Sequence, residues 1–329
     1  MQLIVLGLNH KTAPVEIRER FNFSQDRTVR VLRRLRNNDN LNEAVLLSTC
    51  NRTELYMVLE DPAAGLHFIR TLLRHLAGEQ YKPDYFYNLT GINCVRHLFK
   101  VASSLDSLII GEGQILSQIK NAYHLSRSCG MTDTLFNTLF NRAIAVGKRV
   151  RTETKIAYSS VSVSSAAVDL AIDVVGDLTK ANILVLGAGR MSELTARHLI
   201  DKGAKTIFVS NRNLSHAQEL AEKFNGTAIP YNEFMHQAIT SDIIITSTGA
   251  PHYVITEQGV RDIIPKRSGN PLILVDIAVP RDVDPLVGDI EGVTLYNIDD
   301  LEGVVDMNKN FRSSEAKVAE AIIDEEITA

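Results

Sequence analysis

The sequence predicts a multidomain α/β protein: a ferredoxin-like α+β domain, a Rossmann-type nucleotide-binding domain and the start of a long C-terminal helix. In the first ninety residues, strand-length apolar segments and helical periodicity alternate in the order β-α-β-β-α-β, which is the ferredoxin-like split unit. After residue 155, helices alternate with continuously apolar strands, as in a parallel sheet covered on both faces. A chain of 329 residues is long enough for these parts.

The first domain is expected to span residues 1–155. Its predicted strands cover residues 3–9, 43–48, 53–60 and 85–89, and its predicted helices cover residues 24–36 and 63–77. Ser24 is the expected N-cap of the first of these helices, because a serine hydroxyl accepts a hydrogen bond from a free backbone N–H of the first turn. Residues 91–155 carry helical periodicity almost throughout and are expected to complete the domain.

The second domain is expected at residues 156–295, and a third element at residues 296–329. The predicted strands of the second domain cover residues 182–186, 206–210, 243–247 and 272–277, with helices at 161–175, 191–201 and 214–225. From Asp299 onward the chain has no proline and only one glycine, Gly303, so we expect a long amphipathic helix there.

Composition places the chain among ordinary soluble proteins. Hydrophobic residues make up 45% and charged residues 22%, and neither a membrane span nor a signal peptide is expected. Three widely spaced cysteines, Cys50, Cys94 and Cys129, form no CxxC pair and no metal set, which favours a reducing, cytoplasmic location. The net charge of −4 argues against a surface that is generally coated by nucleic acid, but it leaves room for a local basic patch.

A dinucleotide fingerprint follows the strand at 182–186. The segment Gly187-Ala188-Gly189-Arg190-Met191-Ser192 links a strand to a helix, which is the context that such a fingerprint requires. Gly187 permits the tight turn and Gly189 allows a pyrophosphate to approach the helix N-terminus, whereas Ser192 replaces the third glycine.

The end of the next strand indicates which nicotinamide nucleotide is bound. An NAD-binding protein usually has an acidic residue there, but this chain has Ser210-Asn211-Arg212. A guanidinium suits a 2′-phosphate, so NADPH is favoured over NADH, the alternative being a solvated loop arginine. The segment Ser247-Thr248-Gly249-Ala250, at the end of the strand at 243–247, is expected to lie along the cofactor.

Cys50 is the candidate nucleophile. It lies at the carboxyl end of a buried strand and is followed at once by polar residues, so that its thiolate can face a cleft; the alternative is a cysteine that only packs. A thiol together with NADPH suggests that an acyl group is transferred to sulfur and that the thioester is then reduced to an aldehyde.

At this point the sequence resembles the glutamyl-tRNA reductase family, the first committed enzymes of five-carbon tetrapyrrole synthesis. The segments that carry the resemblance are GLNHKTAP (7–14) with IRE (17–19), STCNRTE (48–54), HLF (97–99) with VAS (101–103), LDS (105–107), GE (111–112) and QIL (114–116), KRVRTET (148–154) with VSV (161–163), and DIAVPRD (276–282).

The resemblance implies a role for each matching residue. Cys50 takes the glutamyl group from the tRNA 3′ end, and His97 assists proton transfer or orientation. Arg52 pairs with the substrate carboxylate. The other residues implied to bind substrate are Thr49, Asn51, Ser107, Glu112, Gln114 and His10.

The resemblance also bears on partners. It implies glutamyl-tRNA(Glu) as substrate, direct handover of the semialdehyde to an aminomutase, and a homodimer held by a helical domain after the spinal helix. Only the beginning of that helix is present here, so the chain looks truncated, and dimerisation and tRNA binding are left open.

Two basic clusters offer phosphate contacts, and each has a solvated helix face as its alternative. They are Arg27, Arg30, Arg33, Arg34 and Arg36, and Arg142, Lys148, Arg149, Arg151 and Lys155.

Two other functions are open from the residues alone. A shikimate-dehydrogenase-like NADP oxidoreductase would share the nucleotide domain but would not need Cys50. A non-catalytic regulator would bind tRNA and NADPH without forming a thioester.

Overall fold

The computed structural model describes residues 1–77, 82–108, 111, 113–154, 156, 163–301 and 309–328. The chain forms two compact units, Met1–Ser160 with Asn308–Ala329, and Val161–Met307. No helix within these ranges combines the length and the apolar character needed to cross a membrane.

A four-stranded antiparallel sheet organises the first unit. Its strands are β1 (Gln2–Asn9), β2 (Leu41–Ser48), β3 (Arg52–Leu59) and β4 (Tyr87–Thr90), in the order β2-β3-β1-β4. This order confirms the ferredoxin-like fold. Period-two alternation sends apolar side chains to both faces, so each face has its own buried core.

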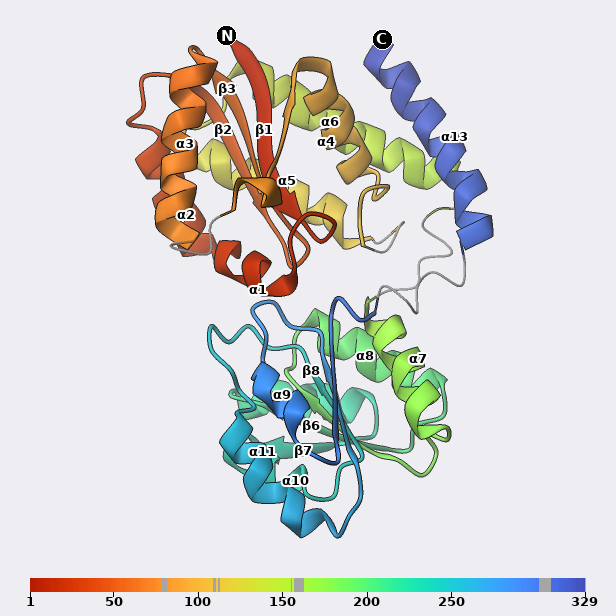
Figure 1. The fold of residues 1–329 in the computed structure, drawn as a ribbon. Helices are drawn as coiled ribbons and strands as arrows, with labels where there is room; N and C mark the ends of the chain where they lie inside the picture. Colours follow the sequence, from red (N-terminus) through yellow and green to blue (C-terminus); the bar gives the residue numbers. More distant parts are fainter. Residues whose placement is uncertain are drawn as a thin grey trace. The chain divides into compact units, whose positions relative to one another are not determined.

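Helices cover both faces of this sheet (Figure 1). The helices α2 (Gln25–Leu35) and α3 (Pro62–Ala77) pack on one face, next to the short α1 (Val15–Arg18). Ser24 caps α2 by accepting a hydrogen bond from the backbone N–H of Arg27 at 3.4 Å. The other face carries α4 (Gly91–Ala102), α5 (Gln114–Ser128) and α6 (Thr134–Glu153).

The described part of the C-terminal helix does not include Asp299, where the sequence predicts the helix to start. It is α13 (Lys309–Thr328), which packs against α4 and α6 of the first unit, whereas residues 299–301 form a turn. The backbone N–H of Asp299 bonds the side chain of Asn297, and the N–H of Asn297 bonds the carboxylate of Asp300. These local side-chain bonds compete with helix formation, which is why a helix does not start at Asp299. Residues 302–308, including Gly303, lie outside the described residues.

Six parallel strands form the sheet of the second unit, in the order β10-β9-β8-β5-β6-β7. This is the Rossmann order, and it confirms the predicted doubly wound fold. The strands are β5 (Asn182–Leu186), β6 (Thr206–Asn211), β7 (Thr227–Pro230), β8 (Ile243–Thr246), β9 (Leu272–Asp276) and β10 (Val293–Asn297). The sequence did not predict β7 and β10, because these edge strands are only partly buried and lack a continuous apolar run.

The main helices of the second unit flank this sheet (Figure 1). They are α7 (Val163–Val175), α8 (Arg190–Asp201), α9 (Leu214–Lys223), α10 (Phe234–Gln237) and α11 (Glu257–Ile263). The order of the strands reverses between β5 and β8, so a crevice opens at their carboxyl ends, where open α/β sheets bind ligands. Short 3-10 helices complete the described elements: η1 (Glu19–Phe21), η3 (Pro83–Tyr85), η4 (Tyr231–Glu233), η5 (Ile264–Arg267) and η6 (Pro285–Asp289).

Candidate active site

The loop between β2 and β3 carries Cys50, and backbone hydrogen bonds fix its shape. The N–H of Thr49 donates to the carbonyl of Arg52 at 2.8 Å, which closes the hairpin. The hydroxyl of Thr49 accepts the N–H groups of Asn51 at 3.2 Å and Arg52 at 3.1 Å. A threonine at this position therefore satisfies the donors of a tight loop, and Cys50 is held half-buried at its tip.

Two further elements clamp this loop. Nη1 of Arg18, from α1, donates to the carbonyl of Cys50 at 3.0 Å and to Oδ1 of Asn51 at 2.9 Å. The N–H of His10, at the end of β1, donates to the carbonyl of Asn51 at 3.0 Å. Burial and the nearby charge of Arg52 lower the pKa of His10 to about 4, so this imidazole is neutral at neutral pH. The thiol is thus presented on a rigid loop.

A fully buried carboxylate, Glu54, lies at the centre of the adjoining polar cluster. It accepts hydrogen bonds from Nη1 of Arg52 at 2.6 Å, Nε2 of His97 at 2.8 Å, the hydroxyl of Tyr56 at 2.6 Å and that of Tyr87 at 2.5 Å. Burial alone would raise the pKa of Glu54, but the positive charges and hydrogen bonds around it hold that pKa well below its usual range. Glu54 is therefore an anion in the folded protein.

The geometry of the sheet explains how these groups meet. Glu54 and Tyr87 both lie opposite Gly7 in the strand register, so all three share one row across the sheet. A Cβ at Gly7 would lie 2.8 Å from Cγ of Glu54 and 3.1 Å from the hydroxyl oxygen of Tyr87. Because Gly7 has no side chain, it leaves the space in which the hydroxyl of Tyr87 bonds the carboxylate of Glu54.

Arg52 is also buried, and two carboxylates occupy its guanidinium. Besides Glu54, it bonds Oδ2 of Asp106, at 3.1 Å from Nη1 and 3.2 Å from Nη2, and Nη2 donates to the Asp106 carbonyl. Lys11 pairs with the same aspartate at 2.5 Å. The Arg52–Glu54 pair is a buried ion pair, so the weak contribution expected of an exposed pair does not apply.

The structure brings most of the predicted substrate residues together. His10, Thr49, Cys50, Asn51, Arg52 and His97 belong to the loop and the cluster beside it. Ser107 follows Asp106 directly, and Gln114 is the first residue of α5. Glu112 lies outside the described residues.

Sequence reasoning missed several members of this cluster. Asp106, Tyr56, Tyr87, Lys11 and Arg18 were not assigned to it. For Tyr56 a signal was present, because it lies two residues from Glu54 on a strand and so faces the same side. The approach of Asp106, which is 54 residues from Arg52 along the chain, had no local signal.

The second unit holds a pocket of about 310 Å³ at the carboxyl ends of β5, β6 and β8. Its lining includes the predicted residues Gly187, Ala188, Gly189, Ser210, Asn211, Arg212, Thr248 and Gly249. It also includes Ser247 and Ala250, which were predicted to lie along the cofactor, and Tyr231, which the sequence did not indicate.

The turn after β5 suits a dinucleotide. Gly187 has φ +112°, and a Cβ there would lie 2.8 Å from the carbonyl oxygen of Ser247. At Gly189 a Cβ would meet nothing within 4 Å, so this backbone is open to a phosphate at the start of α8. The hydroxyl of buried Ser192 lies 2.7 Å from that of Ser247, so the third fingerprint position ties α8 to the end of β8.

Three predicted cofactor residues lie elsewhere: Arg190, Met191 and Ser192 begin α8 and are not part of the pocket lining. Arg212 lies at the end of the pocket, its guanidinium 5.8 Å from the centre of the Tyr231 ring. Asp282 holds the loop after β8, since it accepts the Thr248 N–H at 2.7 Å and the Thr248 hydroxyl. Burial raises the pKa of Asp282, and the bonds from Thr248 oppose that rise.

The Rossmann unit with its glycine turn, in a chain that also presents a clamped thiol, defines a nicotinamide-dependent oxidoreductase. Residues 6–154 match the family model "Glutamyl-tRNAGlu reductase, N-terminal domain", and residues 169–304 match "Shikimate / quinate 5-dehydrogenase". The chain belongs to the glutamyl-tRNA reductase family, whose enzymes catalyse the first step of tetrapyrrole biosynthesis.

Individual relatives support this assignment over nearly the whole chain. The glutamyl-tRNA reductase of Trichlorobacter lovleyi is 47% identical over 330 residues, which cover 99% of this chain and 76% of the relative. That of Brevibacillus brevis is 45% identical and covers 100% of this chain and 73% of the relative. The solved glutamyl-tRNA reductase of Methanopyrus kandleri is 36% identical, with a TM-score of 0.51, covering 99% of this chain and 78% of that one. The resemblance found in the sequence is confirmed.

Proposed function

We propose that the chain reduces glutamyl-tRNA(Glu) to glutamate-1-semialdehyde with NADPH, through a thioester on Cys50. The observation that carries this proposal is the position of Cys50, which is held at the tip of a clamped loop beside a buried cluster of charged groups. A packing cysteine would need neither the clamp nor the cluster.

The Cys50 thiolate attacks the carbonyl carbon of the aminoacyl ester. A C–S bond forms, the C–O bond to the terminal ribose breaks, and the ribose oxygen leaves as a hydroxyl after taking a proton. When bound, NADPH supplies a hydride to the thioester carbonyl carbon. The C–S bond then breaks, the aldehyde is released and the thiolate is regenerated.

His97 is proposed to move the proton. The Glu54 carboxylate only accepts hydrogen bonds, so Nε2 of His97 carries a hydrogen and Nδ1 remains to exchange a proton. Glu54 thereby fixes the tautomer, as a carboxylate does in a hydrolytic triad.

Arg52 is proposed to bind the substrate carboxylate in place of Asp106. Its planar guanidinium already binds two carboxylates, and Asp106 is the less buried of the two. Displacement of Asp106 by substrate would keep the buried cation paired. Thr49, Asn51, His10, Ser107, Glu112 and Gln114 complete the proposed substrate contacts.

NADPH rather than NADH is proposed because Ser210, Asn211 and Arg212 line the pocket at the end of β6. In the described lining of this pocket there is no carboxylate to bind a ribose 2′-hydroxyl. Arg190, Met191 and Ser192 act there through the start of α8 rather than through the pocket lining.

The remaining proposals follow from the family and the cysteines. Residues 1–155 would recognise the substrate, residues 156–295 would bind the nucleotide, and residues 296–329 would begin a spinal helix. The semialdehyde would pass to glutamate-1-semialdehyde aminomutase, and full-length members would be homodimers. Three free cysteines fit the cytoplasm.

A single-turnover reaction with radiolabelled glutamyl-tRNA tests the proposed chemistry. Without NADPH, label should be trapped on the wild-type protein and on Cys129→Ala, a matched control at another half-buried thiol. Addition of NADPH should release the label as semialdehyde. Cys50→Ala should trap none. Equal trapping by Cys50→Ala and the control would overturn the assignment of Cys50.

A further inference from the structure

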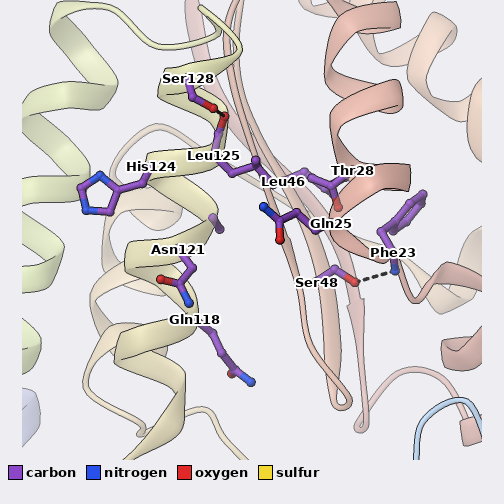
Figure 2. A pocket seen from close by; sticks show the side chains of 11 residues that line it. Phe23, Gln25, Thr28, Leu46, Ser48, Gln118, Asn121, His124, Leu125 and Ser128 are labelled. Atoms are coloured by element: carbon purple, nitrogen blue, oxygen red, sulfur yellow. Dashed lines mark hydrogen bonds between the residues drawn. The ribbon is translucent and has the colours of Figure 1, made fainter. Parts of the chain in front are cut away.

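A second hollow, which we call the α2–α5 pocket, lies between these two helices at the edge of the first sheet (Figure 2). Its volume is about 600 Å³. The side chains of Gln118, Asn121 and His124 come from α5, and those of Gln25 and Thr28 from α2. In Figure 2 the amide of Gln25 lies in the gap between the two helices, and the side chains of Gln118 and Asn121 extend from α5. This wall is polar, and its described lining contains no carboxylate.

The floor of the α2–α5 pocket is the outer edge of β2. This strand is the last of its sheet, and the N–H of Ala44 turns outward to donate to the carbonyl of Met131. Backbone groups of alternate residues in an antiparallel strand point the same way, so the N–H and C=O groups of Leu46 and Ser48 also face outward. Both residues line the pocket. The pocket therefore offers backbone donors and acceptors of β2 in addition to the side-chain amides of α2 and α5.

This set of groups matches the edge of a nucleobase. Asparagine and glutamine amides present a donor beside an acceptor, which is the pattern that pairs with the N6 and N7 positions of adenine. A wall without carboxylates does not repel a ligand that carries phosphates. The volume is within the range of small-molecule sites.

Charge along the neighbouring surface favours a nucleic acid. The side chains of Arg30, Arg33 and Arg34 are exposed on α2, which begins at the pocket. Among the described residues none of these three is joined to a carboxylate by an ion pair. They remain available for phosphates that precede the base in the pocket.

Two arginines of the second basic cluster, Arg142 and Arg149, are paired with carboxylates of α13. Arg149 pairs with Glu325 at 2.8 Å and with Glu326 at 3.0 Å, and Arg142 pairs with Glu326 at 2.6 Å. Guanidinium groups that are held in such a network are poor candidates for binding phosphate. Of the two clusters noted in the sequence, the structure therefore favours the one on α2.

The pocket also lies close to the nucleophile. Ser48 is two residues from Cys50, which in extended chain corresponds to about 7 Å. The ribose of a base seated against Ser48 would lie toward the loop, and in an aminoacylated RNA that ribose carries the acyl ester. We propose that the α2–α5 pocket binds the 3′-terminal adenosine of the aminoacylated RNA, an inference that rests on the proposed function and locates the end of its substrate.

Two small substrates separate base recognition from chemistry. One is 2′(3′)-O-glutamyl-adenosine, and the other is glutamate α-methyl ester, which has no base. The variants Gln118→Leu and Asn121→Leu remove one amide each, and Asn141→Leu, on α6 outside this pocket, is the matched control. The rate constant for covalent trapping on Cys50 is measured by single-turnover mass spectrometry without NADPH.

The pocket variants should react with glutamyl-adenosine about tenfold more slowly than wild type, and with the methyl ester at the wild-type rate. The control should match wild type with both substrates. An equal loss with both substrates would mean that the pocket only supports the loop, and no loss with either would mean that no base binds there. Both results overturn the inference but leave the Cys50 chemistry intact.

Adenosine binding tests the pocket without any chemistry. Saturation-transfer NMR with adenosine, at saturating NADPH to block the nucleotide site, should give a signal with wild type and with Asn141→Leu, and a weaker signal with Asn121→Leu. Wild type that binds adenosine but traps no acyl group would contradict the proposed function and keep the pocket. Wild type that traps the acyl group but gives no adenosine signal would overturn the pocket.

Discussion

Glu54 is a fully buried carboxylate at the centre of the cluster, and Glu54→Gln removes its charge while keeping its size. The buried guanidinium of Arg52 then loses its closer carboxylate partner, and His97, Tyr56 and Tyr87 lose an anionic acceptor. Breaking a buried ion pair by removing one partner costs about 3–5 kcal/mol. Since whole domains are stable by about 5–15 kcal/mol, we expect a large fall in the free energy of unfolding.

The loss of unfolding free energy caused by Glu54→Gln should become smaller as the pH falls. The pKa of Glu54 is lower in the folded protein than in the unfolded chain, so its ionised form stabilises the fold above the unfolded pKa of about 4.3. That stabilisation is lost as the pH falls further toward the folded pKa. The difference between wild type and variant should therefore be full at neutral pH and should shrink below about pH 4.

Denaturant unfolding followed by circular dichroism, at neutral pH and at a series of acidic pH values, measures both effects. Glu60→Gln is the matched control, because Glu60 is exposed and bonds Asn42 at 3.2 Å. It should change the free energy of unfolding by less than about 0.5 kcal/mol. If Glu54→Gln is as stable as this control, or if its deficit does not depend on pH, then Glu54 is not the buried anion inferred here.

Three further predictions concern the nucleotide pocket and the sheet. Arg212→Ala should raise the Kd for NADPH about 10- to 100-fold and change that for NADH little; fluorescence titration measures both, and an equal loss would contradict a 2′-phosphate contact. Asp282→Asn should weaken NADPH binding by releasing the loop after β8, and it should leave acyl trapping on Cys50 unchanged, whereas a loss of trapping would show a wider structural effect. Gly7→Ala should destabilise the first unit by about 1–3 kcal/mol, because its Cβ would meet the side chain of Glu54; thermal melts that match wild type would refute this close packing.

The sequence alone indicated the parts of the fold that depend on local pattern. The strands at β5, β6 and β8 were visible because buried parallel strands are continuously apolar. The glycine turn at Gly187 was visible because only glycine adopts its backbone conformation without strain. The turn at residues 299–301 was not predicted, because the side chains around Asp299 bond the backbone locally in a way that a periodic pattern does not register.

The candidate site likewise has a part that the sequence predicted and a part that only the tertiary structure showed. Cys50 and its neighbours could be assigned because an apolar strand that ends in a cysteine followed at once by polar residues is a local pattern in the sequence. Tertiary structure alone decided that Arg52 is buried against two carboxylates and that Tyr87 reaches Glu54 across Gly7. Packing between distant segments fixes burial and the convergence of charges, and no local pattern of residues encodes which distant segment will pack there.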